Sequence, residues 1–268
     1  MIYCNLKGGL GNMLFQIAAT KSFAIDRNNE CSFPNLKKHL EYLDSDNNHN
    51  PDLKHSMEYL KLFKNLDTSS PTEGEIVRVI HYPFEYIDLE FSDKNVIVDG
   101  FFQSEKYFNH NRKEILKLID FSFISKEYIE SKYSFIKNKK TTSIHIRRGD
   151  YVNYPNIHPT QSLEYYIQSI NILKDKTDLF VVFSDDINWC KENLILENIV
   201  YIDDEKDYIE LYLMSLCDNN ITANSSFSWW GGWLNENPNK IVIGPLKWFG
   251  NDIHHNTGDI LPNNWIKL

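Results

Sequence analysis

The sequence predicts an α/β protein built on parallel sheets, and three observations support this fold class. From residue 141 onward, apolar strand-like runs alternate with helical stretches of roughly ten to fifteen residues. The chain also begins with a short strand, a glycine-rich loop and a helical stretch. Its 268 residues, 42% of them hydrophobic, are enough for two lobes of ordinary domain size.

The first half, residues 1–138, is expected to form one lobe. A strand is predicted over residues 2–6, and apolar residues at helical spacing predict a helix over residues 12–26. The other elements expected here are a short helix at 55–63, strands at 75–80 and 95–101, and helices at 107–119 and 125–138. The stretch 28–70 is otherwise polar and rich in Asn, Lys and Asp.

The second half, residues 139–268, is expected to form a second lobe with a doubly wound parallel sheet. Strands are predicted at 142–147, 179–184, 198–202, 219–223 and 240–243, with helices at 162–174, 186–194, 206–216 and 226–234. Ligands of such sheets bind beyond the carboxyl ends of the strands. Polar motifs follow Arg147, Ser184 and Ala223, so the sequence predicts one ligand site where these three strands end.

Composition excludes several classes of function and location. The net charge of −9 gives no electrostatic support for nucleic-acid binding. The four cysteines form no CxxC pair and are expected to be reduced thiols. No signal peptide is visible, and no apolar run approaches the ~20 residues of a membrane span. A cytoplasmic protein is therefore predicted, and basic and aromatic residues of the first lobe leave room for peripheral membrane contact.

The motif over residues 144–151 contains two arginines at a strand end, followed by a glycine. Because side chains alternate along a strand, His145 and Arg147 leave the same face. The planar guanidinium groups of Arg147 and Arg148 suit a diphosphate, since each makes two charge-assisted hydrogen bonds. The alternative is a structural ion pair between one of these arginines and Asp150, and the spacing leaves both interpretations open.

A second motif covers residues 223–234. Asn224, Ser225 and Ser226 precede an aromatic run, a pattern typical of a helix N-terminus, which attracts phosphate. The serines can therefore cap the helix or contact a phosphate, and Phe227 follows them directly. The three tryptophans of this segment are interpreted as core residues.

Two carboxylates, Asp185 and Asp186, follow the strand predicted at 179–184. One of them can accept the N1–H and amino hydrogens of guanine, and Asp186 can equally cap the next helix. The N-terminal glycine loop, with Gly11 and Asn12, can approach an anion or a sugar. It is neither a dinucleotide fingerprint nor a phosphate-binding P-loop, because it lacks the third glycine and the Gly-Lys-Ser/Thr sequence.

No metal site is expected. Residues 44–50 begin like a calcium loop, but His49 replaces the required glycine and His55 replaces the closing glutamate. Asp44 and Asp46 form a D-x-D pair within a polar loop, which is interpreted as a solvated loop. His254 and His255 have no partner ligands nearby in the sequence.

Three ordered segments give the chain a specific resemblance to a known family. Residues 8–16, 145–151 and 224–234 resemble the alpha-1,2-fucosyltransferase family of bacterial and animal blood-group H type, a glycosyltransferase family 11-like pattern. Segments 183–186 and 211–217 are also similar. Met13 and Gly232 depart from the usual Gln and Ala. The similarity is weak over residues 28–95.

The resemblance implies a GT-B fold with two facing Rossmann-like lobes, an acceptor-side lobe over 1–138 and a GDP-fucose-binding lobe over 139–268. It implies inverting transfer of L-fucose from GDP-fucose to the 2-hydroxyl of a terminal galactose on a glycan or surface-polysaccharide precursor. Neither a metal nor another cofactor is expected. Other regiochemistry (alpha-1,3 or alpha-1,6) and a non-catalytic carbohydrate- or nucleotide-binding protein are the alternatives, and an NAD-dependent enzyme is opposed by the missing fingerprint.

The resemblance also implies roles for individual residues. Arg147 binds the GDP phosphates and offsets the charge of the leaving group. The donor-binding set comprises His145, Arg148, Asp185, Asp186, Asn224, Ser225, Ser226, Phe227, Gly11 and Asn12. Asp150 is the candidate general base, with pairing to an arginine as its competing role, because residues 152–156 contain no carboxylate.

Overall fold

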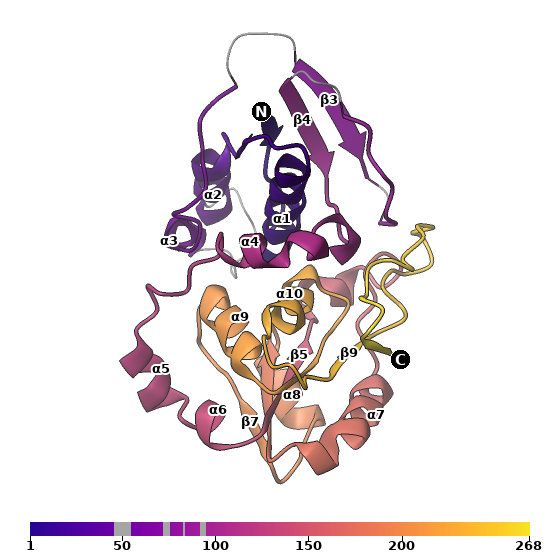
Figure 1. The fold of residues 1–268 in the computed structure, drawn as a ribbon. Coiled ribbons are helices and arrows are strands. Elements are labelled where there is room, and N and C mark those ends of the chain that lie inside the picture. Colours follow the sequence, from indigo (N-terminus) through magenta and orange to yellow (C-terminus); the bar gives the residue numbers. More distant parts are fainter. Residues whose placement is uncertain (46–54, 72–75, 83, 92–94) are drawn as a thin grey trace. The chain divides into compact units, whose positions relative to one another are not determined.

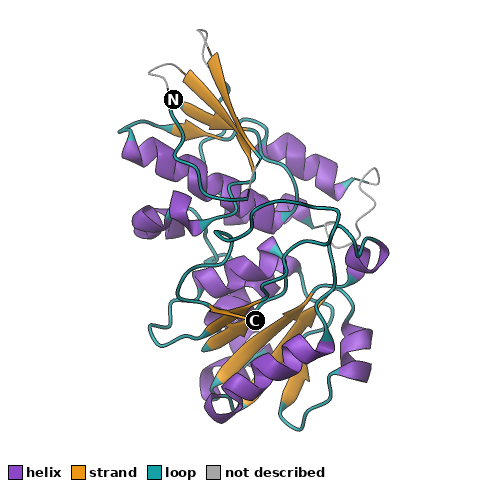
Figure 2. Cartoon of the chain, turned by 90° about the vertical axis from the view of Figure 1, so that its right-hand side faces the viewer, coloured by secondary structure: helices purple, strands orange, loops and turns teal. Residues whose placement is uncertain are grey.

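Two parallel sheets, one in each of two units, form the fold (Figures 1 and 2). The computed structural model describes residues 1–45, 55–71, 76–82, 84–91 and 95–268. Unit 1 comprises residues 1–123 and 255–262, and unit 2 comprises residues 124–254 and 263–268. The predicted α/β class, with two Rossmann-like lobes of parallel strands, is confirmed.

Unit 1 contains a sheet whose described strands follow the order β2-β1-β4-β3. These strands are β1 (Ile2–Cys4), β2 (Cys31–Ser32), β3 (Ile76–His81) and β4 (Asn95–Gly100), and every pairing among them is parallel. The helices are α1 (Leu10–Asp26), α2 (Leu36–Asp44), α3 (Tyr59–Leu62) and α4 (Arg112–Leu116), with 3-10 turns at Ser56–Glu58, Glu105–Tyr107 and Asn109–Asn111. The long helix α1 is buried along most of its length, which makes it the central helix of this unit.

Unit 2 contains a six-stranded parallel sheet in the order β10-β9-β8-β5-β6-β7 among the described residues. Its strands are β5 (Thr141–Ile146), β6 (Leu179–Ser184), β7 (Ile199–Tyr201), β8 (Asn219–Ile221), β9 (Val242–Gly244) and β10 (Ile266–Lys267). Its helices are α5 (Lys126–Lys132), α6 (Phe135–Asn138), α7 (Leu163–Leu173), α8 (Ile187–Asn193), α9 (Asp207–Leu216) and α10 (Ser226–Leu234), with 3-10 turns at Gly149–Asn153 and Lys174–Lys176. Among the strands described in this unit, only β10 was not expected from the sequence.

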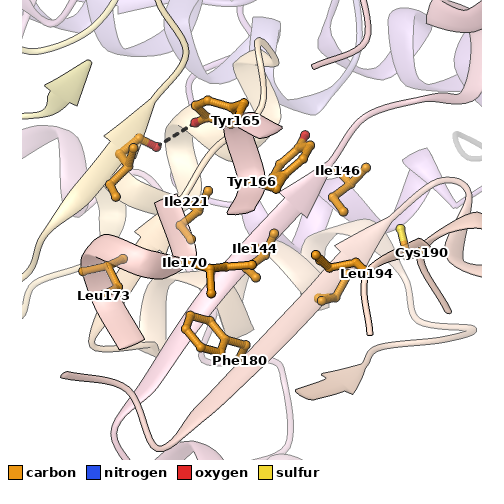
Figure 3. Close-up of a cluster of buried hydrophobic side chains, with 12 residues drawn as sticks. Ile144, Ile146, Tyr165, Tyr166, Ile170, Leu173, Phe180, Cys190, Leu194 and Ile221 are labelled. Atoms are coloured by element: carbon orange, nitrogen blue, oxygen red, sulfur yellow. Dashed lines mark hydrogen bonds between the residues drawn. The ribbon is translucent and has the colours of Figure 1, made fainter. Parts of the chain in front are cut away.

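The core of unit 2 lies against the face of β5 that carries Ile144 and Ile146. These two residues pack with Tyr166 and Ile170 of α7 in a cluster that extends across the neighbouring strands (Figure 3). On the opposite face, Asn220 Nδ2 donates to Ser143 Oγ at 2.7 Å and to the Met214 carbonyl of α9 at 2.8 Å. The sheet is therefore covered on both faces, and all six residues of β5 are buried.

The division between units differs from the sequence-based boundary near residue 139. Helix α5 lies in unit 2, where Glu205 accepts hydrogen bonds from Tyr133 Oη at 2.6 Å and from Lys132 Nζ at 2.5 Å. These contacts link residues more than 70 positions apart, a link that local patterns do not reveal. Two helices expected from the sequence are also interrupted. The helix expected over residues 125–138 breaks at Tyr133–Ser134. The helix expected over residues 107–119 begins with 3-10 turns around Asn109 and Asn111, because Asn disfavours helix interiors.

No helix within the described ranges is long and apolar enough to cross a membrane.

Candidate active site

Three polar motifs of unit 2 follow the adjacent strands β8, β5 and β6. Arg147 comes directly after β5, Asp185 directly after β6, and Asn224 three residues after β8. Because the strands are parallel, these motifs share one edge of the sheet. Side-chain contacts connect all three, as follows.

Arg147 is held by two carboxylates of different exposure. Its Nη1 lies 2.8 Å from Asp185 Oδ2, and its Nη2 lies 2.6 Å from Asp150 Oδ1. The Asp185 side chain is only 7% exposed, whereas that of Asp150 is 58% exposed. Burial lowers the pKa of the Arg147 guanidinium, but the two carboxylates outweigh it and raise that pKa above its ordinary value. The guanidinium is thus a fixed cation, anchored by Asp185 from inside the protein.

Gly149 is required where it stands because of Asp185. A Cβ atom at this position would collide with Asp185 Oδ2. The other oxygen, Oδ1, accepts the backbone N–H of Arg148 at 2.8 Å. Asp185 therefore fixes both the arginine side chain and the backbone turn that carries it.

Arg148 has a different environment from Arg147. Its Nε donates to Asp186 Oδ2 at 2.9 Å, and its guanidinium carbon lies 4.0 Å from the centre of the Trp189 ring. Asp186 also caps α8 by accepting the N–H of Trp189. The helix-cap role left open for Asp186 is thus present, and Arg148 is engaged by side chains of α8 and its cap.

His145 lies beneath this edge in the strand itself. Its side chain is buried, and Nδ1 has no hydrogen-bond partner among the described residues. Its ring centre lies 5.5 Å from that of Phe227 in α10. Burial, followed by the charge of Arg147, lowers the pKa of His145 to about 3, so the imidazole is neutral at pH 7.

The segment before α10 supplies backbone groups rather than a side-chain cap. Ser225 is extended and buried, and its hydroxyl makes no capping bond. The side chain of Ser225 therefore does not cap the N–H groups of the first helical turn, which include those of Ser226 and Phe227. N–H groups at a helix N-terminus can bind an anion. The Asn224 amide is engaged elsewhere, donating to the carbonyls of Pro159 and Trp248 at 2.9 Å each. Asn224 thus fixes the loops around the site.

Tyr151 and His158 join the motifs but were not singled out as site residues from the sequence. The Tyr151 hydroxyl donates to the Asn224 carbonyl at 3.2 Å, and its ring centre lies 5.3 Å from the Arg147 guanidinium. His158 stacks on Tyr151 with ring centres 4.8 Å apart. Burial raises the pKa of Tyr151 to about 12, so it remains a hydrogen-bond donor. The sequence could have indicated Tyr151 as a site residue, because it lies in the arginine motif of residues 144–151. It contains no comparable signal for His158.

Gly11 and Asn12 lie in unit 1, at the start of α1. Asn12 Oδ1 accepts a hydrogen bond from Gln103 Nε2 at 2.7 Å. Gly8 adopts φ +78°, and a Cβ there would come within 2.6 Å of Asn12 Nδ2. The backbone of the loop therefore passes close to the Asn12 side chain, and glycine at position 8 leaves room for it.

The rejected calcium and D-x-D motifs lie largely outside the described residues, since only Asp44 and Ser45 of residues 44–54 are described. Elsewhere in the described chain, no group of three or more His, Cys, Asp or Glu side chains could hold a metal ion.

Comparisons with known proteins identify the family to which this chain belongs. The family model described as glycosyl transferase family 11 matches residues 81–268. The chain is 32% identical to the alpha-1,2-colitosyltransferase of Escherichia coli, covering 100% of this chain and 99% of that protein. It is 29% identical to the O-antigen biosynthesis glycosyltransferase WbnK of Escherichia coli, covering 100% of both chains. A similar solved structure is NodZ alpha-1,6-fucosyltransferase soaked with GDP-fucose, at 12% identity and a TM-score of 0.48, covering 86% of this chain and 91% of that one.

The protein is thus an enzyme that transfers a sugar. The chain belongs to glycosyl transferase family 11, and the resemblance predicted from residues 8–16, 145–151 and 224–234 is confirmed.

Proposed function

We propose that the enzyme transfers L-fucose from GDP-β-L-fucose to the 2-hydroxyl of a terminal galactose, with inversion at the sugar carbon. The observation that carries this proposal is Arg147, which the buried Asp185 fixes in place. Tyr151 links it to the N-terminus of α10, since its ring lies 5.3 Å from the guanidinium and its hydroxyl donates to the Asn224 carbonyl. An anionic diphosphate leaving group needs both a cation and aligned N–H donors. The alpha-1,2 linkage in the names of an Escherichia coli relative and of fucosyltransferase relatives supports the regiochemistry.

The donor diphosphate would take the place of Asp150 on Arg147. An exposed ion pair contributes only about 0.2–1 kcal/mol, so this contact is readily exchanged. The buried contact to Asp185 keeps the guanidinium in position during the exchange. Ser225 and Ser226 would bind phosphate oxygens, and Phe227 would line the sugar pocket.

The guanosine would be held by His145 and by one carboxylate. The unpartnered Nδ1 of His145 supports a ligand contact at this position. Of the two predicted carboxylates, Asp186 is 36% exposed and Asp185 only 7%, which favours Asp186 for guanine. Gly11 and Asn12 would contact the transferred sugar, as the family resemblance implies.

In the proposed reaction, the acceptor hydroxyl attacks the fucose anomeric carbon as the bond from that carbon to the β-phosphate oxygen breaks. GDP leaves with the bonding electrons, and Arg147 and the N–H groups of α10 offset its charge. The hydroxyl proton passes to a base, for which Asp150, once released from Arg147, is the candidate. We propose that this needs no metal ion, because these protein groups supply the positive charge.

Colitosyl transfer is the second candidate, since the alpha-1,2-colitosyltransferase covers the whole chain. Colitose lacks one hydroxyl that fucose carries, at carbon 3. A site built to hydrogen-bond that hydroxyl would reject colitose strongly, whereas a site without such a contact would accept both. The relative named for O-antigen biosynthesis supports action on a lipopolysaccharide precursor. The galactose-containing acceptor and a cytoplasmic site are parts of the proposal that rest on the family resemblance.

The test is release of GDP from GDP-fucose, and separately from GDP-colitose, with a β-galactoside acceptor in EDTA. Arg147→Lys keeps the charge but loses the planar fork, so kcat should fall about 10²–10³-fold. Arg78→Lys makes the same change at an exposed arginine of unit 1 and should leave kcat unchanged. Asp150→Asn should lower kcat without lowering stability.

Each part of the proposal can fail separately. Loss of wild-type activity in EDTA would remove the metal-free mechanism. Turnover of GDP-colitose alone would replace fucose as the donor sugar. Linkage analysis of the product decides between alpha-1,2 and the alternatives alpha-1,3 and alpha-1,6.

A further inference from the structure

A pocket of about 320 Å³ opens in unit 1 beside the C-terminal end of α1. This volume falls within the usual range for small-molecule sites, roughly 300–1,000 Å³. Its polar and aromatic lining includes Asp26, Arg27, Tyr86, Asp88, Lys106 and His110. All of these residues belong to unit 1, and none belongs to the site described above.

Three of the charged groups that line the pocket, those of Asp26, Arg27 and Lys106, are already paired with protein groups. Both carboxylate oxygens of Asp26 lie 3.0 Å from His110 Nε2. The Arg27 guanidinium stacks on Phe91 at 3.9 Å and donates to the carbonyls of Phe23 and Leu89. Lys106 forms an ion pair with Asp259. An anionic ligand would have to break these pairs, so the pocket does not favour a phosphate.

The pocket does offer the two surfaces that a sugar ring requires. Tyr86 is 38% exposed and packs on Tyr107 with ring centres 4.8 Å apart, which gives a fixed aromatic surface. Around it, the lining supplies hydrogen-bonding groups from two carboxylates, two cationic side chains and one imidazole, so carboxylates and cationic side chains are equal in number. An aromatic face rimmed by balanced polar groups suits a neutral polyhydroxylated ring.

The pocket is distant from the glycine loop of the same unit. Helix α1 runs from Leu10 to Asp26, so Asn12 and Asp26 are 14 residues apart. At 1.5 Å per residue, this separation is about 21 Å along the helix axis. One sugar ring cannot contact both Asn12 and Asp26, so a ligand reaching both must be an oligosaccharide.

We propose that this pocket binds a neutral sugar unit of the acceptor oligosaccharide, several units away from the galactose that receives fucose. This inference rests on the proposed function, in which Asn12 contacts the transferred sugar. The proposal predicts that the benefit of this pocket depends on the length of the acceptor. A long acceptor uses the pocket, and a disaccharide does not reach it.

The experiment compares two acceptors, N-acetyllactosamine and a linear hexasaccharide of three N-acetyllactosamine repeats, with GDP-fucose as donor. Tyr86→Ala should lower kcat/KM for the hexasaccharide roughly five- to tenfold through KM, and leave the disaccharide unchanged. Tyr42→Ala, which removes a 56% exposed tyrosine of α2 in the same unit, should affect neither acceptor. Equal loss for both acceptors, or no loss for the hexasaccharide, overturns the proposal.

A binding measurement separates this proposal from the proposed function. Saturation-transfer NMR with the hexasaccharide and GDP should show contact with wild-type enzyme and a weaker signal with Tyr86→Ala. If no acceptor is fucosylated but this Tyr86-dependent signal persists, the transfer reaction fails and the sugar pocket stands. Absence of a Tyr86-dependent signal, or its displacement by inorganic phosphate, would refute a neutral-sugar site.

Discussion

The two sheets have the same parallel topology but differ in how deeply their strands are buried. All six residues of β5 in unit 2 are buried, whereas only His81 is buried among the six residues of β3 in unit 1. Strand β5 lies between β8 and β6, while β3 pairs with β4 alone among the described strands. One strand is central and covered on both faces, and the other is a partly exposed edge.

This difference teaches where a rigid polar site can be built. A side chain at the end of a covered strand is positioned by packing beneath it, as Asp185 positions Arg147. At the end of β4, Asp99 also pairs with cations, namely Lys7 and Arg78, but Arg78 is 62% exposed. Solvent therefore screens the Asp99–Arg78 contact more than the Asp185–Arg147 contact, in which the two side chains are 7% and 21% exposed. The covered sheet therefore provides preorganisation, and the exposed one tolerates change.

The largest expected effect compares these two aspartates. Asp185→Asn removes the buried partner of Arg147, so the free energy of unfolding should fall by about 3 kcal/mol and activity should fall with it. Asp99→Asn should cost about 1 kcal/mol, because its partners Arg78 and Lys7 are 62% and 33% exposed and its ion pairs are therefore screened by solvent. Urea unfolding of both variants measures the difference. Equal losses of stability would mean that Asp185 and Asp99 contribute equally to folding, which would contradict the difference drawn here between the two sheets.

The sequence was informative about unit 2 because its signals are local. Strands and helices alternate regularly along the sequence. Arg147 ends the strand predicted at 142–147, Asp185 follows the strand predicted at 179–184, and Ser225 stands two residues after the strand predicted at 219–223. Parallel topology alone then places them at one edge. The choice between ligand and ion pair was not accessible from the sequence, since the Arg147–Asp185 contact joins residues 38 positions apart.

Unit 1 was less predictable from the sequence because its pocket is formed by contacts between residues far apart in the chain. Its pocket combines α1 with residues 86–89 and 106–110, and no periodic pattern connects these segments. The pairing of Lys106 with Asp259 spans 153 positions and returns a C-terminal segment to the first unit. Tyr86 carries no local signal of a binding surface, because its packing partner Tyr107 lies 21 positions further along the chain.

The second prediction compares two buried histidines, His145 in β5 and His81 at the end of β3. Burial lowers both pKa values, that of His145 to about 3, while the Glu85 carbonyl partly counteracts burial at His81. A lowered folded pKa means that the unfolded chain binds more protons below pH 6.5, so stability falls as the pH falls. For His145 the slope approaches 1.4 kcal/mol per pH unit between about pH 6 and pH 4.

Urea unfolding of wild type, His145→Gln and His81→Gln across pH 4–7 measures these slopes. His145→Gln should flatten the acid dependence by nearly one proton, and His81→Gln should flatten it less. A greater change from His81→Gln would contradict the stronger desolvation assigned to the covered sheet.

The smallest expected effect uses one substitution at two places. Ile144→Val removes a methyl group from the covered core, where Ile144 is 0% exposed, and should cost about 0.5–1.5 kcal/mol. Ile80→Val removes the same group from β3, where Ile80 is 56% exposed, and should change stability by less than about 0.5 kcal/mol. Valine keeps the β-branched shape, so strand propensity does not confuse the comparison. A loss at Ile80 as large as that at Ile144 would mean that the exposed face of β3 is covered in solution, for example by a second copy of the chain, which a concentration-dependent unfolding midpoint would reveal.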